Sequence, residues 1–388
     1  MRIENRNSQI GESVNEQIGE SVNPSIGESK TITIGPYHPY LLEPSVLDLQ
    51  VQEGRVSGAT VTLGFVNRAV EELMATKTYR QNVFLAERIC GICSNIHTLA
   101  FCQAAERIMS IAVPDRAKAI RTIMVELERL HSHFLCLGLL SHALHEAQPY
   151  VRIMKDRETL VSLLERVSGN RVHYGVNTVG GVRRDVTPAL AADIREGLGA
   201  LEAVSEFAVD ALGARGCLGS RIAGLGVRDG AQALDLGAVG PTLRGSGIAS
   251  DVRKEEGYAA YSAVTFDVIV EQDGDARARF LVRARETLES IRIIRQLLAA
   301  LPDGPILGEL KEPPLKETRE VLERVEAPRG ELVYFVESNG TNIPERVKIR
   351  TPTFANVYFL TKALEGEQVD DARPIIESID PCLSCTDR

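Results

Sequence analysis

The chain has 388 residues, of which 44% are hydrophobic, and this is sufficient for a large apolar core. Its net charge of −9 and its lack of tryptophan argue against nucleic acid as a partner, because nucleic-acid-binding surfaces are usually basic and stack bases on aromatic rings. Seven cysteines follow an N-terminus without a secretory signal, so we expect a reducing cytoplasm and no disulfide framework. No apolar run reaches the roughly 18 residues that a membrane-spanning helix needs.

Residues 1–30 carry a repeat with a period of eight residues. The sequence Ile-Gly-Glu-Ser recurs at 10–13, 18–21 and 26–29. The repeat is too short and too polar to bury a core, so we expect a flexible tail or a short surface hairpin stack. A docking segment for a partner is the alternative.

Strands are expected first after the repeat. Residues 47–52 alternate strictly between apolar and polar, and Glu53-Gly54 predicts a turn before a second strand over 56–65. A helix over 66–78 should follow.

Long helices are expected in the middle of the chain. They are predicted over 94–111, 114–145, 150–168, 188–211, 275–300 and 354–364, with glycine-rich irregular stretches at 169–185 and 213–250 and a strand pair at 331–338 and 346–349. This order predicts an α+β fold with a central bundle of long helices and small peripheral β-sheets.

Two Cys-x-x-Cys pairs lie at opposite ends of the chain. They are Cys90 with Cys93 and Cys382 with Cys385. Four thiolates are enough for one complete metal site, and the spacing alone leaves structural zinc, an iron–sulfur cluster and a redox metal centre open. A shared site would join nearly the whole chain into one cooperative unit.

The residues around the cysteines distinguish these alternatives. The first pair lies in Arg88-x-Cys-Gly-x-Cys-x-x-x-His97, and the second lies in Asp380-Pro-Cys-x-x-Cys-x-x-Arg388. Together they resemble the signature of nickel–iron hydrogenase large subunits. The ending with Arg in place of His resembles the group 4 membrane-bound, energy-converting enzymes, such as the Ech-type, CO-induced and formate-hydrogenlyase enzymes. The resemblance implies that residues 31–388 form a catalytic domain with the nickel–iron hydrogenase large-subunit fold, which interconverts H2 with protons and electrons.

The resemblance also implies how the cysteines act. Cys90 and Cys382 would be terminal nickel ligands, and Cys93 and Cys385 would bridge nickel to an iron that carries one CO and two cyanides. Soft thiolates suit a redox-active nickel, and Cys382 would also accept the proton from H2 cleavage. His97, one helical turn beyond Cys93, would hydrogen-bond the bridging sulfur.

Two carboxylates are assigned by the same resemblance. Glu43, near the start of the matching region, would be the first proton carrier between a nickel thiolate and the outside, since burial can raise its pKa. Glu71 lies in a similar motif, in which Asn67 and Ala69 stand where the family pattern has His and Gly. Glu71 would help to hold an additional Mg or Fe ion.

Five further residues would surround the diatomic ligands. Arg329, after Pro328, would donate to one cyanide and polarise H2, because a guanidinium stays charged and presents fixed donors. The Thr353 hydroxyl would bind the second cyanide, Pro352 would pack on the diatomic ligands, and Arg350 would line the same side of the iron.

The expected partners follow from the same family. They are a small subunit with an iron–sulfur cluster close to the cysteines, membrane-anchor and ion-translocating subunits, and maturation factors, which would cut any precursor after Arg388. The protein would then lie on the cytoplasmic side of the cell membrane, attached through these subunits.

Other functions are compatible with part of the sequence. Residues 125–185 also resemble the quinone-site subunit of respiratory complex I, which shares the fold but lacks the nickel-binding cysteines. A related sulfur-reducing group has altered cysteine motifs. The four cysteines of this chain favour a hydrogenase over a quinone or sulfur role, and a structural zinc protein is a third alternative.

Overall fold

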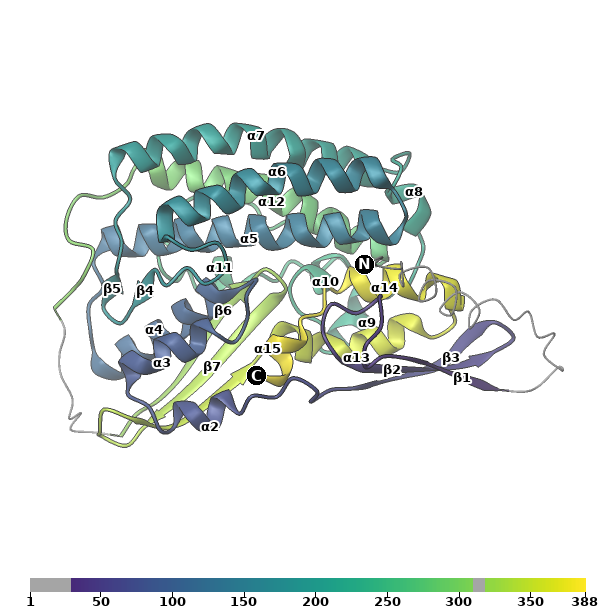
Figure 1. The fold of residues 1–388 in the computed structure, drawn as a ribbon, viewed down its shortest axis with the longest axis horizontal. Coiled ribbons are helices and arrows are strands. Elements are labelled where there is room, and N and C mark those ends of the chain that lie inside the picture. The colour runs from purple at the N-terminus through teal and green to yellow at the C-terminus, as the bar shows by residue number, and fades with distance from the viewer. Residues whose placement is uncertain (1–28, 310–317) are drawn as a thin grey trace, which may run out of the picture.

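The computed structural model describes residues 29–309 and 318–388. The predicted N-terminal repeat therefore lies outside the described residues, apart from its last two positions. Within the described parts, a bundle of long helices packs above a three-stranded sheet, and a second sheet projects to one side (Figure 1). This arrangement confirms the predicted α+β fold with a central helical bundle.

Four helices form the bundle. They are α5 (Asp115–Ala143), α6 (Ala147–Ser168), α7 (Pro188–Leu212) and α12 (Ala276–Ala299). Helix α5 packs against α6 and α12, and α7 packs against the same two helices (Figure 1). Thr187 and Asp275 cap the N-termini of α7 and α12 by accepting backbone N–H groups, which explains why both helices begin there.

Two antiparallel sheets flank the bundle. The strands are β1 (Lys30–Ile34), β2 (Val46–Gln52) and β3 (Arg55–Thr62) in the first sheet, and β6 (Glu320–Ala327), β7 (Gly330–Ser338) and β8 (Pro344–Arg350) in the second. The sequence predicts β2, β3, β7 and β8 but not β6. Strand β6 mixes four charged residues with apolar ones, yet it pairs with β7 along its whole length.

Shorter elements complete the fold. They are α2 (Val70–Met74), α3 (Tyr79–Glu87), α4 (Ser94–Met109), β4 (Asn177–Thr178), β5 (Gly181–Val182), α8 (Gly219–Ile222), α9 (Gly230–Asp235), α10 (Pro241–Arg244), α11 (Val252–Glu255), η1 (Tyr261–Ala263), α13 (Pro352–Leu364), η2 (Val369–Asp371), α14 (Ala372–Ser378) and α15 (Leu383–Asp387). In the parts of the chain that the structure describes, no helix is both long and apolar enough to cross a membrane.

The predicted helix over 66–78 is wrong. Within this range only α2 is helical, and α3 begins after it, at Tyr79. Ala69 adopts a left-handed conformation with φ of 53° and donates its N–H to the side chain of Asn67, which delays the start of α2. Thr78 then forms a capping box with Gln81 and starts α3. These two caps place the end of α3 directly before the first cysteine pair.

The two segments that carry the cysteine pairs meet in the core. One large apolar core runs through the bundle and the β6–β8 sheet and includes all four motif cysteines. A smaller core lies between the β1–β3 sheet and helices α13 and α14. Helix α15 packs against α13, close to the centre of the molecule (Figure 1). The C-terminal cysteine pair is thereby brought to the first pair.

Candidate metal centre

The four motif cysteines converge in one buried cluster. The sulfur of Cys90 lies 3.5 Å from that of Cys382, Cys93 lies 3.3 Å from Cys385, and Cys382 lies 3.2 Å from Cys385. Thiolates bound to one metal ion at about 2.3 Å lie within roughly 4 Å of one another. The donor set therefore fits a thiolate-bound metal centre.

Local capping positions the first pair. Cys93 is the residue at which α4 begins, and the sulfur of Cys90 accepts backbone N–H groups from Ile92 and Cys93. The buried carboxylate of Glu128, on α5, accepts the N–H groups of Asn95 and Ile96 at 2.6 and 2.9 Å. A side chain from the bundle thus satisfies the first turn of α4 and fixes the direction of the cysteine loop.

One arginine joins the two cysteine segments. The Arg68 guanidinium donates to the carbonyl oxygens of Arg88 and Ile89, both at 2.9 Å, and to that of Ser384 at 2.7 Å. Arg68 lies in the motif before α2, where the sequence gives it no role. One planar guanidinium therefore holds together the two loops that contain the cysteine pairs, which are nearly 300 positions apart in the chain.

The thiols influence one another's protonation. Hydrogen bonds from the neighbouring thiols lower the pKa of Cys90 and lower that of Cys382 to about 7, whereas contacts with Cys382 raise the pKa values of Cys93 and Cys385. Cys90 and Cys382 therefore lose their protons at a lower pH than an ordinary thiol does, and Cys93 and Cys385 keep theirs to a higher pH. Metal binding would displace the remaining protons, since the thiolate is the ligand.

Arg329 is held rigidly beside the cysteines. Its guanidinium donates to the carbonyl oxygen of Asp380 at 2.7 Å, to the Asp380 carboxylate at 2.9 Å and to the Ser132 hydroxyl at 3.0 Å. Burial alone would lower the pKa of Arg329, but the charge of Asp380 holds it well above its ordinary value. The residue therefore carries a permanent positive charge in the core.

A small cavity adjoins Cys93 and Cys385. Its walls are formed by Cys93, His97, Ala327, Pro328, Arg329, Leu332, Pro352, Thr353 and Cys385. Four of the five residues expected around the diatomic ligands thus share one cavity. The fifth, Arg350, does not line it, because its guanidinium donates to the Glu331 carboxylate at 2.8 Å instead.

His97 and Thr353 present polar atoms to this region. A ring nitrogen of His97 lies within 4.8 Å of the sulfurs of Cys93 and Cys385, and Nδ1 pairs with the Tyr334 hydroxyl at 2.9 Å. Burial lowers the pKa of His97 to about 3, so the ring is neutral near pH 7. The Thr353 oxygen accepts the N–H of Cys382 at 3.0 Å, which leaves its own hydroxyl proton free to be donated.

Glu43 contacts the second cysteine pair directly. Its carboxylate accepts the N–H groups of Leu383 and Ser384, the latter at 2.9 Å. Burial raises the pKa of Glu43, and the neighbouring Cys382 raises it further, while the hydrogen bonds oppose the rise. An acid with a raised pKa beside a metal thiolate is suited to proton exchange.

Glu71 does not fit an additional divalent cation. Its oxygens accept from Lys348 at 2.6 Å, from the N–H of Ile349 at 2.9 Å and from Arg388 at 2.8 Å. Burial raises the pKa of Glu71, but these hydrogen bonds outweigh it and the net shift is downward. Two cationic side chains therefore occupy the carboxylate that a metal ion would need.

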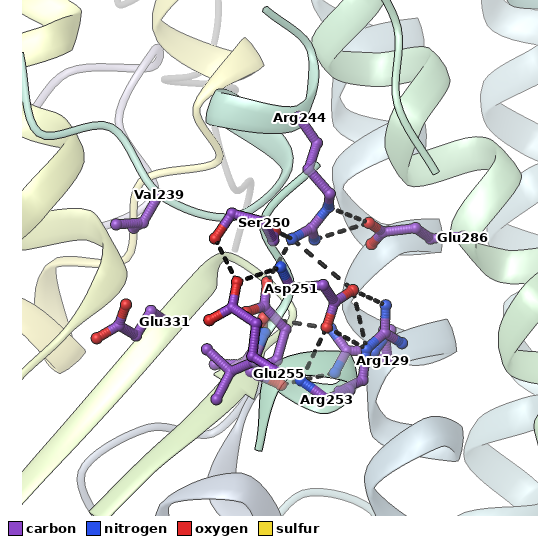
Figure 2. Close-up of polar contacts among 12 residues, drawn as sticks. Arg129, Val239, Arg244, Ser250, Asp251, Arg253, Glu255, Glu286 and Glu331 are labelled. Atoms are coloured by element: carbon purple, nitrogen blue, oxygen red, sulfur yellow. Dashed lines mark hydrogen bonds and ion pairs between the residues drawn. The ribbon is translucent and has the colours of Figure 1, made fainter. Parts of the chain in front are cut away.

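A buried charge network lies beside the strand that leads to Arg329, and Figure 2 shows its members Arg129, Arg244, Asp251, Arg253 and Glu286. The network comprises three guanidiniums and four carboxylates: Arg129, Arg244, Arg253, Glu126, Asp251, Glu286 and Glu326. Arg129 donates to the carbonyl oxygens of Glu326 and Ala327, and Arg244 pairs with the Glu326 carboxylate at 2.8 Å. The network therefore fixes both the backbone and a side chain of the strand that leads into Arg329.

Comparison with known proteins places this geometry in a family. The family described as respiratory-chain NADH dehydrogenase, 49 kDa subunit, matches residues 146–318 and 307–388, and the nickel-dependent hydrogenase family matches residues 68–182. The carbon monoxide-induced hydrogenase of Rhodospirillum rubrum is 37% identical over 366 residues, which cover 92% of this chain and 98% of the relative. The chain belongs to the nickel-dependent hydrogenase and complex I 49 kDa subunit family.

Other members of this family differ in activity. NADH-quinone oxidoreductase subunit 4 of Thermus thermophilus is 35% identical over 382 residues, covering 92% of this chain and 93% of the relative. A chain in the structure of the membrane-bound sulfane sulfur reductase, an archaeal respiratory membrane complex, matches with a TM-score of 0.87 and 31% identity, covering 94% of this chain and all of that chain. Membership of this family supports the fold and an oxidoreductase activity. Because the relatives act on different substrates, the substrate of this chain has to be inferred from the residues of its site.

Proposed function

We propose that this chain is the catalytic subunit of a nickel–iron hydrogenase, which interconverts H2 with protons and electrons. The observation that carries the proposal is the convergence of four buried thiols beside a fixed, buried guanidinium. A quinone site has no need of four thiols in contact, and a structural zinc site has no need of Arg329 at an adjoining cavity.

Each cysteine has a distinct place in the proposed centre. Cys90 and Cys382 would hold nickel as terminal ligands, and Cys93 and Cys385 would bridge nickel to an iron with one CO and two cyanides. The bound centre would supply the redox chemistry and an open coordination position for hydrogen. Cys93 and Cys385 are the two cysteines that line the cavity, which supports their assignment as the bridges on the iron side.

The surrounding residues would orient the diatomic ligands and the substrate. Arg329 carries a permanent charge, and Thr353 has a free hydroxyl proton, so each can donate a hydrogen bond to a cyanide. Pro328 and Pro352 supply apolar walls that exclude water from the cavity. Arg350 would act only indirectly, by fixing Glu331 on β7.

Proton transfer is assigned to Cys382 and Glu43. Cys382 would be the thiolate that accepts the proton, and Glu43 contacts the backbone of the two residues that follow it. Glu43 would therefore pass protons between the Cys382 thiolate and the outside of the core.

The partners would be an iron–sulfur subunit, which exchanges electrons with the centre, and membrane subunits that couple turnover to ion translocation. One matched chain belongs to a structure described as a membrane-bound respiratory complex, which supports membrane-subunit partners for this chain. Maturation factors would insert the metals, and the complex would lie on the cytoplasmic side of the membrane.

A substrate comparison tests this function. The assembled complex is assayed with reduced dye for H2 evolution, for sulfide release from polysulfide and for quinone reduction. We expect H2 evolution and no comparable rate with the other two acceptors. Polysulfide reduction without H2 evolution would assign the chain to the sulfur-reducing branch of the family.

A further inference from the structure

A second cavity lies beside the proposed centre. It is lined by residues of the β1–β2 connection, by two residues of α5, and by the segment that leads from α14 toward Cys382. Its volume for water-sized molecules is about 50 Å³. One water molecule needs roughly 10–15 Å³ on this measure, so the cavity has room for a short chain of waters.

Two carboxylate oxygens at this cavity have no partner among the described residues. They are Oδ2 of Asp380 and Oε2 of Glu377, and both residues line the cavity. Their other oxygens are engaged, since Asp380 accepts from Arg329 at 2.9 Å and Glu377 accepts from Arg373 at 3.1 Å. A buried acceptor without a hydrogen bond costs free energy, so both oxygens favour water as the missing partner.

The residues that line the cavity extend from neighbours of the metal pocket to the outer layer of the protein. At its inner end, Asp380 pairs with Arg329, and Leu383 donates its N–H to Glu43. At its outer end, the side chains of Arg373 and Glu377 are 16% and 14% exposed. Glu377 therefore lies between the groups around the proposed centre and solvent.

We propose that Glu377 is an outer proton-relay residue, which exchanges protons between solvent and a water chain that fills this cavity. The inference rests on the proposed hydrogenase function and extends the proton route beyond Glu43. In each proton transfer, Oε2 of Glu377 gains one proton from solvent or the water chain and gives one proton to the other. The carboxylate therefore returns to its starting protonation state. Asp380 is paired with Arg329, and its role is only to accept hydrogen bonds from the water chain.

The surroundings of Glu377 suit this exchange. Burial raises the pKa of Glu377 to about 7, Arg373 opposes the rise, and Asp380 adds to it. Two titratable groups on other elements lie nearby. Burial raises the pKa of Cys136 on α5 far above its ordinary value. Burial and the charge of Arg373 lower the pKa of His38 in the β1–β2 connection. Both are uncharged near pH 7, so Arg373 and Asp380 supply the charges that act on Glu377.

The substitution Glu377→Gln tests the relay in the assembled complex. Glutamine keeps the size of the side chain and can accept from Arg373, but it cannot carry a proton. We expect H2 turnover to fall at least about tenfold and the solvent deuterium isotope effect to rise, while the infrared bands of the metal ligands keep their positions. Glu377→Asp should restore part of the turnover.

Glu202→Gln is the matched control, because Glu202 is an exposed carboxylate paired with Arg295 at 2.7 Å on the far helices α7 and α12. It should change neither the turnover nor the isotope effect. Wild-type turnover in Glu377→Gln, or a shift of its metal-ligand bands, would overturn the relay.

A second readout does not depend on hydrogenase activity. Infrared difference spectra recorded during a pH titration should contain a carboxylic acid band that titrates near neutrality and is absent from Glu377→Gln. This band requires only the folded chain, so failure of the hydrogenase proposal would leave it in place. Its absence from the wild-type protein would contradict the relay specifically.

Discussion

The segment from Glu326 to Arg329 joins two buried polar clusters of opposite design. In the charge network, each of the three guanidiniums faces at least one carboxylate, so attraction within the protein offsets much of the cost of burial. In the cysteine cluster, four groups of the same kind face one another at 3.2 to 3.5 Å. If all four were ionised, they would repel one another.

The difference indicates which cluster is scaffold and which is site. The charge network balances its charges within the chain, and it holds the strand that leads to the site through the backbone of residues 326 and 327 and the Glu326 side chain. The cysteine cluster reaches its fully ionised state only with an added cation, because no basic side chain donates to its sulfurs in the described residues.

Removal of one bridging thiol should have the largest effect. Cys385→Ser is expected to abolish H2 turnover and the bound nickel, because a hydroxyl is a poor ligand for a soft metal. Metal analysis and H2 evolution measure both effects. Cys217→Ser, at an exposed cysteine outside the cluster, is the control and should retain both. Turnover retained in Cys385→Ser would show that the bridge is assigned to the wrong residue.

Breaking the charge network should destabilise the fold strongly. Arg244→Met leaves Glu286 and Glu326 buried without their cation, and loss of one partner of a buried pair costs about 3–5 kcal/mol. Urea unfolding measures the change. Arg295→Met, which breaks the exposed pair with Glu202, should cost about 1 kcal/mol or less. An equal decrease in the free energy of unfolding in the two variants would mean that the buried network stabilises the fold no more than a surface ion pair does.

The Arg329 fork should matter for catalysis more than for metal binding. Arg329→Lys keeps the charge but cannot reach Asp380 and Ser132 with a planar fork. We expect turnover to fall about 10²-fold or more with nickel retained, since removal of a positioned donor typically costs that much. Loss of nickel in this variant would instead assign Arg329 to the assembly of the site.

The ion pairs of Glu71 should give the smallest effect. Lys348→Met is expected to lower the free energy of unfolding by about 1 kcal/mol or less at pH 7. The pKa of Glu71 is lowered in the folded state, so its contribution is complete above the unfolded value of about 4.3 and is lost as the pH falls through the folded value. The difference between variant and wild type should therefore shrink below about pH 4. Added magnesium should not change the free energy of unfolding of either protein. Stabilisation by magnesium would contradict the finding that Lys348 and Arg388 occupy the Glu71 carboxylate.

The sequence predicts the features that local patterns specify. Helical periodicity predicts the four bundle helices, and resemblance to hydrogenase large subunits at residues 326–330 and 350–353 points to Arg329, Pro352 and Thr353. Ser132 and Glu128 could not be predicted, because their roles depend on the packing of α5 against segments distant in sequence. Arg68 lies between Asn67 and Ala69, in the motif that contains Glu71. Its contact with Ser384 forms only when the segments that carry the two cysteine pairs come together.

Infrared spectroscopy combined with metal analysis of the purified complex tests the central claim most directly. The account predicts about one nickel and one iron per chain, together with stretching bands of one CO and two cyanides. Zinc alone, without those bands, would contradict it.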